Sequence, residues 1–132
     1  MINKINRITF IIKSTRNYEQ MSNDYISVLC TCPDEEIGAA IAHRLVNEHA
    51  IACANIIPKI RSIYRWSGNI EDETEVLLIM KTSQVMYNKV ESLILEHHPY
   101  DTPEVISLNI ENGSKQYLDW IDQSLSETGN SP

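Results

Sequence analysis

The stretch SIYRWSGNIEDETEVLLIMKT, residues 62–82, decides the fold of this 132-residue chain. Its turn-forming residues Ser67-Gly68-Asn69 predict that the chain reverses direction there. The segments on either side of the turn, residues 52–66 and 73–82, are rich in apolar and β-branched residues and are predicted to pair as a long hairpin. Pro58 has no amide hydrogen to donate to a sheet, so it indicates a bend, a bulge or an edge position in the first strand.

The strand at residues 73–82 is apolar on both of its faces. Val76, Leu78 and Met80 point to one side, whereas Leu77 and Ile79 point to the other. An antiparallel sheet with one face in water alternates apolar and polar residues, and large exposed apolar patches are rare on monomers. We therefore expect another copy of the chain to cover the second face. The alternative is that a C-terminal helix covers that face alone.

The remaining chain supplies two more strands and three helices. Pro33, followed by acidic residues, suits the first turn of a helix, and Pro99 predicts the end of another helix at the residues before it. The order β-α-β-β-α-β with an extra C-terminal helix predicts a ferredoxin-like α+β sandwich. The predicted strands are residues 25–31, 52–66, 73–82 and 104–110, and the predicted helices run from Pro33 to about residue 47, from Ser83 to His97 and from Gly113 to Leu125.

Composition and charge argue against several classes of function. The chain has a net charge of −7, and apart from a basic segment at residues 1–20 it is strongly acidic, so we expect no nucleic-acid partner. No apolar stretch approaches the roughly 20 residues of a membrane-spanning helix, so we expect no membrane insertion. Three cysteines make no disulfide framework, which favours the reducing cytoplasm. We expect one domain at residues 25–126, a flexible extension at residues 1–24 and a polar tail at residues 127–132.

Six strings, in order between Tyr25 and Leu125, resemble the CutA family of divalent-cation tolerance proteins. They are LCTCPD (29–34), ACANIIP (52–58), SIYRWSG (62–68), KT (81–82), HHPYDTPE (97–104) and YLDW (117–120). The resemblance implies a homotrimer, similar in assembly to the PII signalling proteins, in which the long hairpin strands pair between subunits. It also implies a role in tolerance of copper and other divalent cations.

The resemblance further implies a metal site in which Cys30, His97 and His98 bind Cu(II) or another divalent ion such as zinc. Thiolate and imidazole together suit copper and zinc. Successive residues on a helix point about 100° apart, so we expect only one of the two histidines to face a site shared with Cys30. Cys32 is two residues away on the same strand and points the same way. In the alternative interpretation, Cys30 is a packed core thiol and His97 packs on an apolar helix face.

A second group of polar and aromatic residues is a candidate for a small-ligand pocket between subunits. Glu73, Glu75 and Lys81 share one strand face by alternation, and a lysine near carboxylates and aromatic rings is typical of a small-ligand site. The alternative is an interface salt bridge with aromatic packing. The group consists of Tyr64, Trp66, Glu73, Glu75, Lys81, Tyr100 and Trp120.

The sequence favours a binding protein over an enzyme, because it has no glycine-rich phosphate loop, no H-E-x-x-H, no CxxC and no nucleophile-elbow serine. The leading hypothesis is a homotrimer that serves divalent-cation, above all copper, tolerance and binds the ion itself. One alternative is a PII-like signalling trimer that binds a small ligand in its intersubunit clefts. Another is a structural or adaptor trimer without a ligand.

Overall fold

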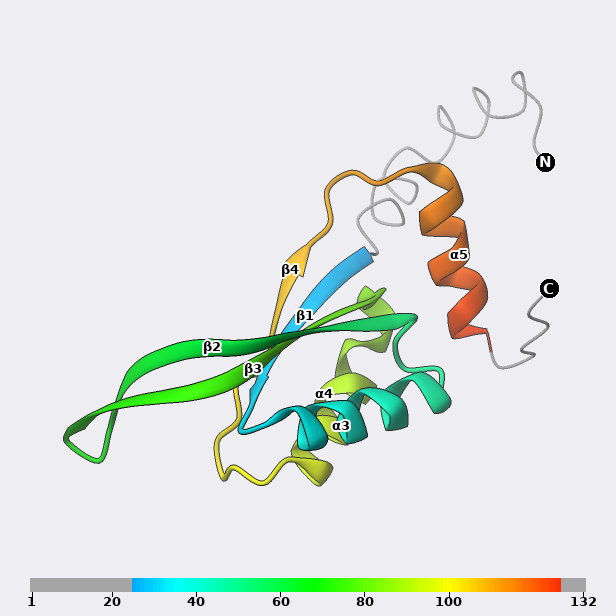
Figure 1. Cartoon of the computed structure of the whole chain (residues 1–132). Helices are drawn as coiled ribbons and strands as arrows, with labels where there is room; N and C mark the ends of the chain where they lie inside the picture. The colour runs from blue at the N-terminus through cyan, green and yellow to red at the C-terminus, as the bar shows by residue number, and fades with distance from the viewer. Residues whose placement is uncertain (1–24, 127–132) are drawn as a thin grey trace, which may run out of the picture.

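The structure, a computed structural model, describes residues 25–126 as one antiparallel sheet with two helices against one of its faces and a third helix at one end (Figure 1). The extension predicted at residues 1–24 and the tail at 127–132 lie outside the described residues. The element order is the predicted β-α-β-β-α-β followed by a helix. The elements are β1 (Tyr25–Cys32), α3 (Glu35–Asn47), β2 (Cys53–Trp66), β3 (Asn69–Ser83), a 3₁₀ turn (Gln84–Met86), α4 (Tyr87–His97), β4 (Ile106–Asn109) and α5 (Lys115–Leu125).

The sheet has the strand order β2-β3-β1-β4, and all neighbouring strands are antiparallel. The β2–β3 register shifts between Ile57, which pairs with Leu77, and Ile60, which pairs with Glu75. Pro58 lies inside this bulge, as its missing amide hydrogen predicts. Beside it Lys59 has the left-handed φ of 58° that a bulge residue often takes.

The core lies between one face of the sheet and helices α3 and α4. The even-numbered residues of β1 and the buried part of β3 point into it, since side chains alternate along a strand. Helix α3 begins at Asp34, whose carboxylate accepts a hydrogen bond from the Ile37 amide at 2.9 Å. The buried apolar residues of this core include Ile26, Val28, Cys30, Cys32, Ile41, Leu45, Val76, Leu78, Met80, Val90 and Ile94.

The β2–β3 hairpin extends well beyond the body of the domain as an arm (Figure 1). On one face of this arm Ile63 and Ile70 are 63% and 68% exposed, and on the other Trp66 is 53% exposed. The helix-free face of the sheet likewise carries exposed Ile57, Ile106 and Leu108.

Helix α5 covers only the end of the sheet where β1 begins. There the Tyr25 hydroxyl donates to Asp122 at 2.5 Å, and the Cys53 sulfur lies 3.5 Å from the Tyr117 hydroxyl. In the described part of the chain, α5 alone therefore does not cover the second apolar face. None of the helices between residues 25 and 126 is both long and apolar enough to cross a bilayer.

Strand β3 starts at Asn69, four residues before the predicted start at 73, and the boundaries of two further elements differ clearly from the predictions. The chain after Ser83 makes a 3₁₀ turn before α4 starts at Tyr87, and the Ser83 side chain makes no capping hydrogen bond. Strand β4 is shorter than the predicted residues 104–110, because the residues after Pro103 pair with β1 only from Ile106 onward.

Candidate functional site

Two thiols and one imidazole meet where β1 ends and α4 ends. The sulfurs of Cys30 and Cys32 and a ring nitrogen of His98 all lie within 4.8 Å of one another. All three side chains are buried, the two cysteines completely. Among the residues that the structure describes, this is the only group of three or more cysteine, histidine and acidic side chains so close together.

Local backbone structure explains why these three residues meet. Alternation along β1 directs Cys30 and Cys32 to the helix-covered face. Pro99 disfavours a helical conformation at His98, which adopts φ −83° and ψ 138° as the residue that ends α4. His97 is the last helical residue; it is exposed, and its Nε2 lies 4.0 Å from Glu96. The structure thus places His98 and Cys32 beside Cys30 and leaves His97 outside the group.

Both ring nitrogens of His98 already have backbone partners. The Tyr100 amide donates to Nδ1 at 3.1 Å, so Nδ1 carries no proton, and the protonated Nε2 donates to the Thr31 carbonyl at 2.8 Å. These bonds tie residues 98–100 to β1. A metal ion that coordinates His98 must displace one of them.

The two thiols influence each other's acidity. Hydrogen bonding to Cys32, and then burial, raises the pKa of Cys30, whereas the hydrogen bond from Cys30 lowers the pKa of Cys32. Of the two thiols, Cys32 therefore loses its proton more readily. The Cys30 sulfur also donates to the Thr31 carbonyl at 3.6 Å.

The chemistry of this donor set fits a thiophilic ion. Two sulfurs and one imidazole nitrogen suit copper or zinc better than magnesium or calcium, which prefer oxygen. Cys30, Cys32 and His98 would hold the ion, with the imidazole giving up one backbone hydrogen bond. Cys32 entered the sequence interpretation only as a neighbour of Cys30, although strand alternation already placed its thiol on the same side.

The structure divides the predicted polar and aromatic group into two places. Tyr64, Trp66, Glu75 and Tyr100 line a pocket of about 380 Å³ between the arm and the α4–β4 loop. Glu73 lies next to this pocket and accepts a hydrogen bond from the Tyr64 hydroxyl at 3.0 Å. The pocket residues that the sequence interpretation missed are Thr31, Asp101, Thr102 and Glu104. The last three follow Tyr100 within the HHPYDTPE string, which was the available signal.

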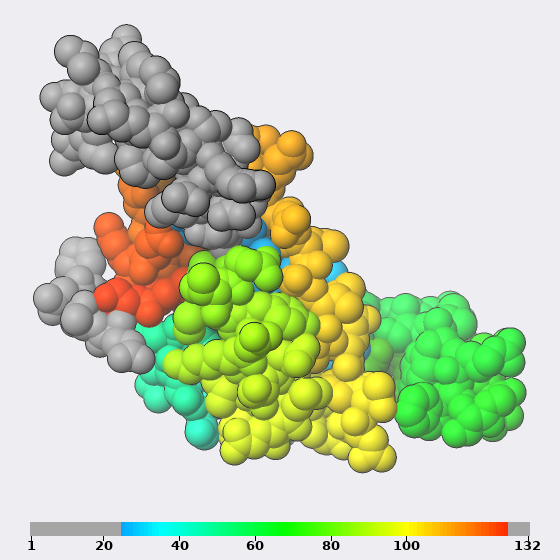
Figure 2. All heavy atoms as spheres, turned by 180° about the vertical axis from the view of Figure 1, so that it is seen from behind, coloured from blue at the N-terminus to red at the C-terminus, as the bar shows by residue number. Residues whose placement is uncertain are grey.

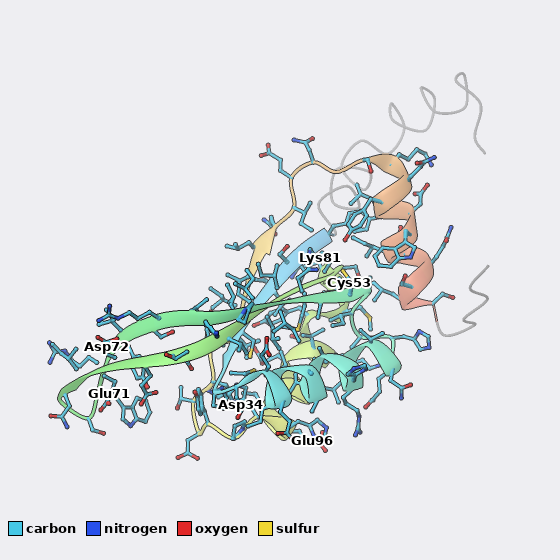
Figure 3. The ribbon with its side chains drawn as sticks, viewed as in Figure 1. Asp34, Cys53, Glu71, Asp72, Lys81 and Glu96 are labelled. Atoms are coloured by element: carbon cyan, nitrogen blue, oxygen red, sulfur yellow. The ribbon has the colours of Figure 1, made fainter. Side chains whose placement is uncertain are left out.

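Lys81 and Trp120 do not line this pocket within one chain, and the predicted pocket between subunits stays a prediction. Lys81 donates to the side chain of Asn55 and lies opposite Cys53, at the α5 end of the sheet (Figure 3). Trp120 packs on α5 against Tyr117, with ring centroids 5.4 Å apart. Alternation correctly put Lys81 on the face of Glu75, but six residues of strand separate the two by roughly 20 Å.

Burial and hydrogen bonding keep two tyrosines of the pocket protonated. Burial, and then the hydrogen bond to Glu75, raises the pKa of Tyr100 above its usual range. The hydrogen bond to Glu73 raises the pKa of Tyr64. Both phenols therefore act as hydrogen-bond donors to carboxylates.

Comparison with known proteins identifies the family. A family model described as "CutA1 divalent ion tolerance protein" matches residues 26–124. "Divalent-cation tolerance protein CutA" of Thermus thermophilus is 43% identical over 94 residues, covering 71% of this chain and 91% of that protein. "Protein CutA" of Mus musculus is 40% identical over 101 residues, which cover 76% of this chain but only 57% of the mouse protein.

A solved structure agrees with these sequence matches. The crystal structure of CutA1 from Oryza sativa superposes with a TM-score of 0.76 at 38% identity, covering 79% of this chain and 95% of the rice chain. The family model covers nearly all described residues, and the identity to the Thermus protein is well above the level at which only a fold is shared. The chain therefore belongs to the CutA1 divalent ion tolerance protein family.

Proposed function

We propose that this protein serves divalent-cation tolerance by binding a thiophilic metal ion at Cys30, Cys32 and His98. The observation that carries the proposal is the convergence of three buried ligand atoms within 4.8 Å. The names of the relatives, which refer to divalent-cation tolerance, support the same conclusion. Copper and zinc are the proposed ions, because they accept sulfur and nitrogen ligands together.

We also propose that the working form is a homotrimer in the cytoplasm. The apolar residues of the helix-free face and the arm support assembly, because a monomer would leave Ile57, Ile63, Ile70, Ile106 and Leu108 in water. The free thiols support a reducing compartment. Sedimentation equilibrium measures the assembly directly. A trimer mass for the wild type and a smaller mass for Ile63→Asp/Ile70→Asp support it, and a monomeric wild type at micromolar concentration contradicts it.

The metal site is tested by anaerobic titration of the reduced, tag-free protein with Zn²⁺ and with copper, followed by calorimetry. We expect one strong site per subunit, lost in the variants Cys30→Ser, Cys32→Ser and His98→Ala. His97→Ala and Cys53→Ser are the matched controls, because each removes a ligand type from outside the group. Metal binding that survives when all three substitutions are combined in one variant contradicts the site. Binding lost in His97→Ala but kept in His98→Ala would instead make His97 the imidazole ligand of the ion.

A further inference from the structure

We infer that the pocket between the arm and the α4–β4 loop binds a small organic cation, such as an alkylammonium ion. This site is separate from the thiol and imidazole cluster. Its lining residues come from one chain, so the inference does not require metal binding.

The pocket has the size of a small-molecule site. Its volume of about 380 Å³ falls in the range of small-ligand pockets. Tyr64 and Trp66 of the arm line it together with Tyr100 and the residues that follow it. Figure 2 shows the arm standing beside that segment. A ligand in this space would contact residues of β1, β2, β3 and the α4–β4 loop together.

Glu75 gives the pocket its charge. Its side chain is only 5% exposed, and its Oε2 accepts a hydrogen bond from the Tyr100 hydroxyl at 2.7 Å. The other oxygen, Oε1, has no hydrogen-bond partner among the described residues. No fully buried side-chain oxygen there lacks a partner, so Oε1 keeps some contact with solvent; Glu75 lines this pocket and also a second cavity beside Pro58 and Lys59. A nearly buried carboxylate with one oxygen that accepts no hydrogen bond from the protein favours a positively charged ligand.

The protein supplies no cation of its own to this carboxylate. The four ion pairs of the described residues join Arg44 to Glu48, Arg61 to Asp72, His97 to Glu96 and Lys115 to Asp119. None of them includes an acidic residue of the pocket. Asp101 and Glu104, both exposed, add two further carboxylates to its lining and strengthen the local negative field.

Aromatic rings determine the class of cation. Tyr64, Trp66 and Tyr100 line the pocket, and indole and phenol faces attract organic cations, tryptophan most strongly. A bare divalent metal would need several oxygens converging on one point. The carboxylates of Glu75, Asp101 and Glu104 do not converge in this way, because the described residues contain no acidic group of three with ligand atoms within 4.8 Å. The combination therefore fits a desolvated ammonium ion with an apolar shell.

The two tryptophans of the chain make the test direct. In a Trp120→Phe background, Trp66 is the only tryptophan and reports on the pocket. We expect choline to change its emission saturably, whereas 3,3-dimethyl-1-butanol, which has the same shape without the charge, leaves it unchanged. Replacing Glu75 by Gln keeps the shape and removes the charge, and should weaken choline binding by about tenfold or more. Glu96→Gln makes the same charge change on α4, away from the pocket, and should leave binding unchanged.

Each contrary result overturns the inference in a recognisable way. Equal binding of the neutral alcohol would show that the pocket recognises the apolar shape of the ligand and not its charge. A larger response to Mg²⁺ than to choline would make it an inorganic cation site. No choline response, together with a changed sedimentation mass in Glu75→Gln, would mean that a second copy of the chain fills the pocket. If Glu75→Gln fails to fold, the exposed Glu104→Gln replaces it, with an expected weakening of about two- to fivefold, and unchanged binding there counts against the inference.

Discussion

The imidazole of His98 donates to the main-chain carbonyl of Thr31 across 2.8 Å, and so joins the end of α4 to the end of β1. The two residues are 67 positions apart in the sequence. The other ring nitrogen accepts from the Tyr100 amide. One side chain thus holds the start of the α4–β4 loop against the sheet, and it does so between the cysteine pair and the pocket.

Replacing His98 by Ala should lower the free energy of unfolding by roughly 1–3 kcal/mol, because it leaves a partly buried carbonyl and an amide without their partner. Urea unfolding at a fixed protein concentration measures this. The matched control is His97→Ala, whose exposed ring should change stability by no more than about 0.5 kcal/mol. Equal losses in the two variants would contradict the role of the His98 hydrogen bonds.

The Tyr100 phenol should make stability fall at alkaline pH. Its pKa is raised in the folded protein by burial and by the hydrogen bond to Glu75, whereas in the unfolded chain it ionises near the ordinary value of about 10. Above that value the unfolded chain binds fewer protons than the folded one, so the free energy of unfolding decreases as pH rises. Below it this contribution is fully present.

Tyr100→Phe isolates that contribution. The variant should be less stable than the wild type at pH 8, by about 1 kcal/mol for the lost hydrogen bond. Its stability should fall less steeply above pH 10. Urea midpoints measured from pH 8 to 11 for both proteins give the comparison, and parallel curves would show that Tyr100 does not ionise differently in the two states.

Deletion of Lys59 should straighten the arm. Pro58 and Lys59 together oppose Val76, so removing Lys59 leaves one residue against one and makes the pairing regular. The residues beyond the bulge keep their partners on β3 and therefore their faces, but the bend at this point is lost, so Tyr64 and Trp66 should move relative to the rest of the pocket, and we expect stability to fall by about 1 kcal/mol or more. Trp66 emission in the Trp120→Phe background and urea unfolding record both effects.

Lys59→Gly is the control for this deletion. It keeps the bulge, and glycine accepts the φ of 58° without strain, so stability should stay within about 1 kcal/mol of the wild type. A deletion variant that keeps the wild-type emission of Trp66 would mean that the bulge does not set the direction of the arm.

Helix α3 approaches the sheet closely at Gly38. A Cβ at this position would lie 3.1 Å from Val76 Cγ2 and 3.3 Å from Leu78 Cδ2. In Gly38→Ala the usual gain in helix propensity of about 1 kcal/mol should therefore be largely offset by crowding. Gly38→Val should destabilise by roughly 1–3 kcal/mol.

The exposed Ala40, two residues further along α3, serves as the reference position for that series. Ala40→Val should cost only about 0.5 kcal/mol, because it carries the propensity penalty without the crowding. Thermal and urea unfolding of the variants compare the two sites. If valine has the same effect at both positions, the close approach of α3 to Val76 is not a packing constraint.

Local patterns predicted the fold well because the elements are strongly marked. Alternation in the two hairpin strands, the turn at Ser67-Gly68-Asn69 and the break at Pro99 each rest on local chemistry that tertiary packing did not override. The 3₁₀ turn after Ser83 and the short β4 depend on packing against β1 and could not be read from propensity alone.

The candidate site was predictable only in part. Alternation gives the face on which a side chain lies, so the partnership of Cys30 and Cys32 was accessible from the sequence. Whether His97 or His98 joins them depends on one residue of helix length, which is the least predictable feature of a helix end. Lys81 shows what alternation leaves open, since it shares a face with Glu75 but does not line the pocket within one chain.

The double engagement of His98 has a thermodynamic consequence. Thr31 and Tyr100, the two residues that its ring holds, also line the pocket. An ion that takes one nitrogen of His98 would release one of these two residues, and so would alter the affinity of the pocket. Linkage is reciprocal, so a bound organic cation would change the affinity for the ion by the same factor. The imidazole of His98 would then couple the two binding sites of this small domain, so that occupancy of one site changes the affinity of the other.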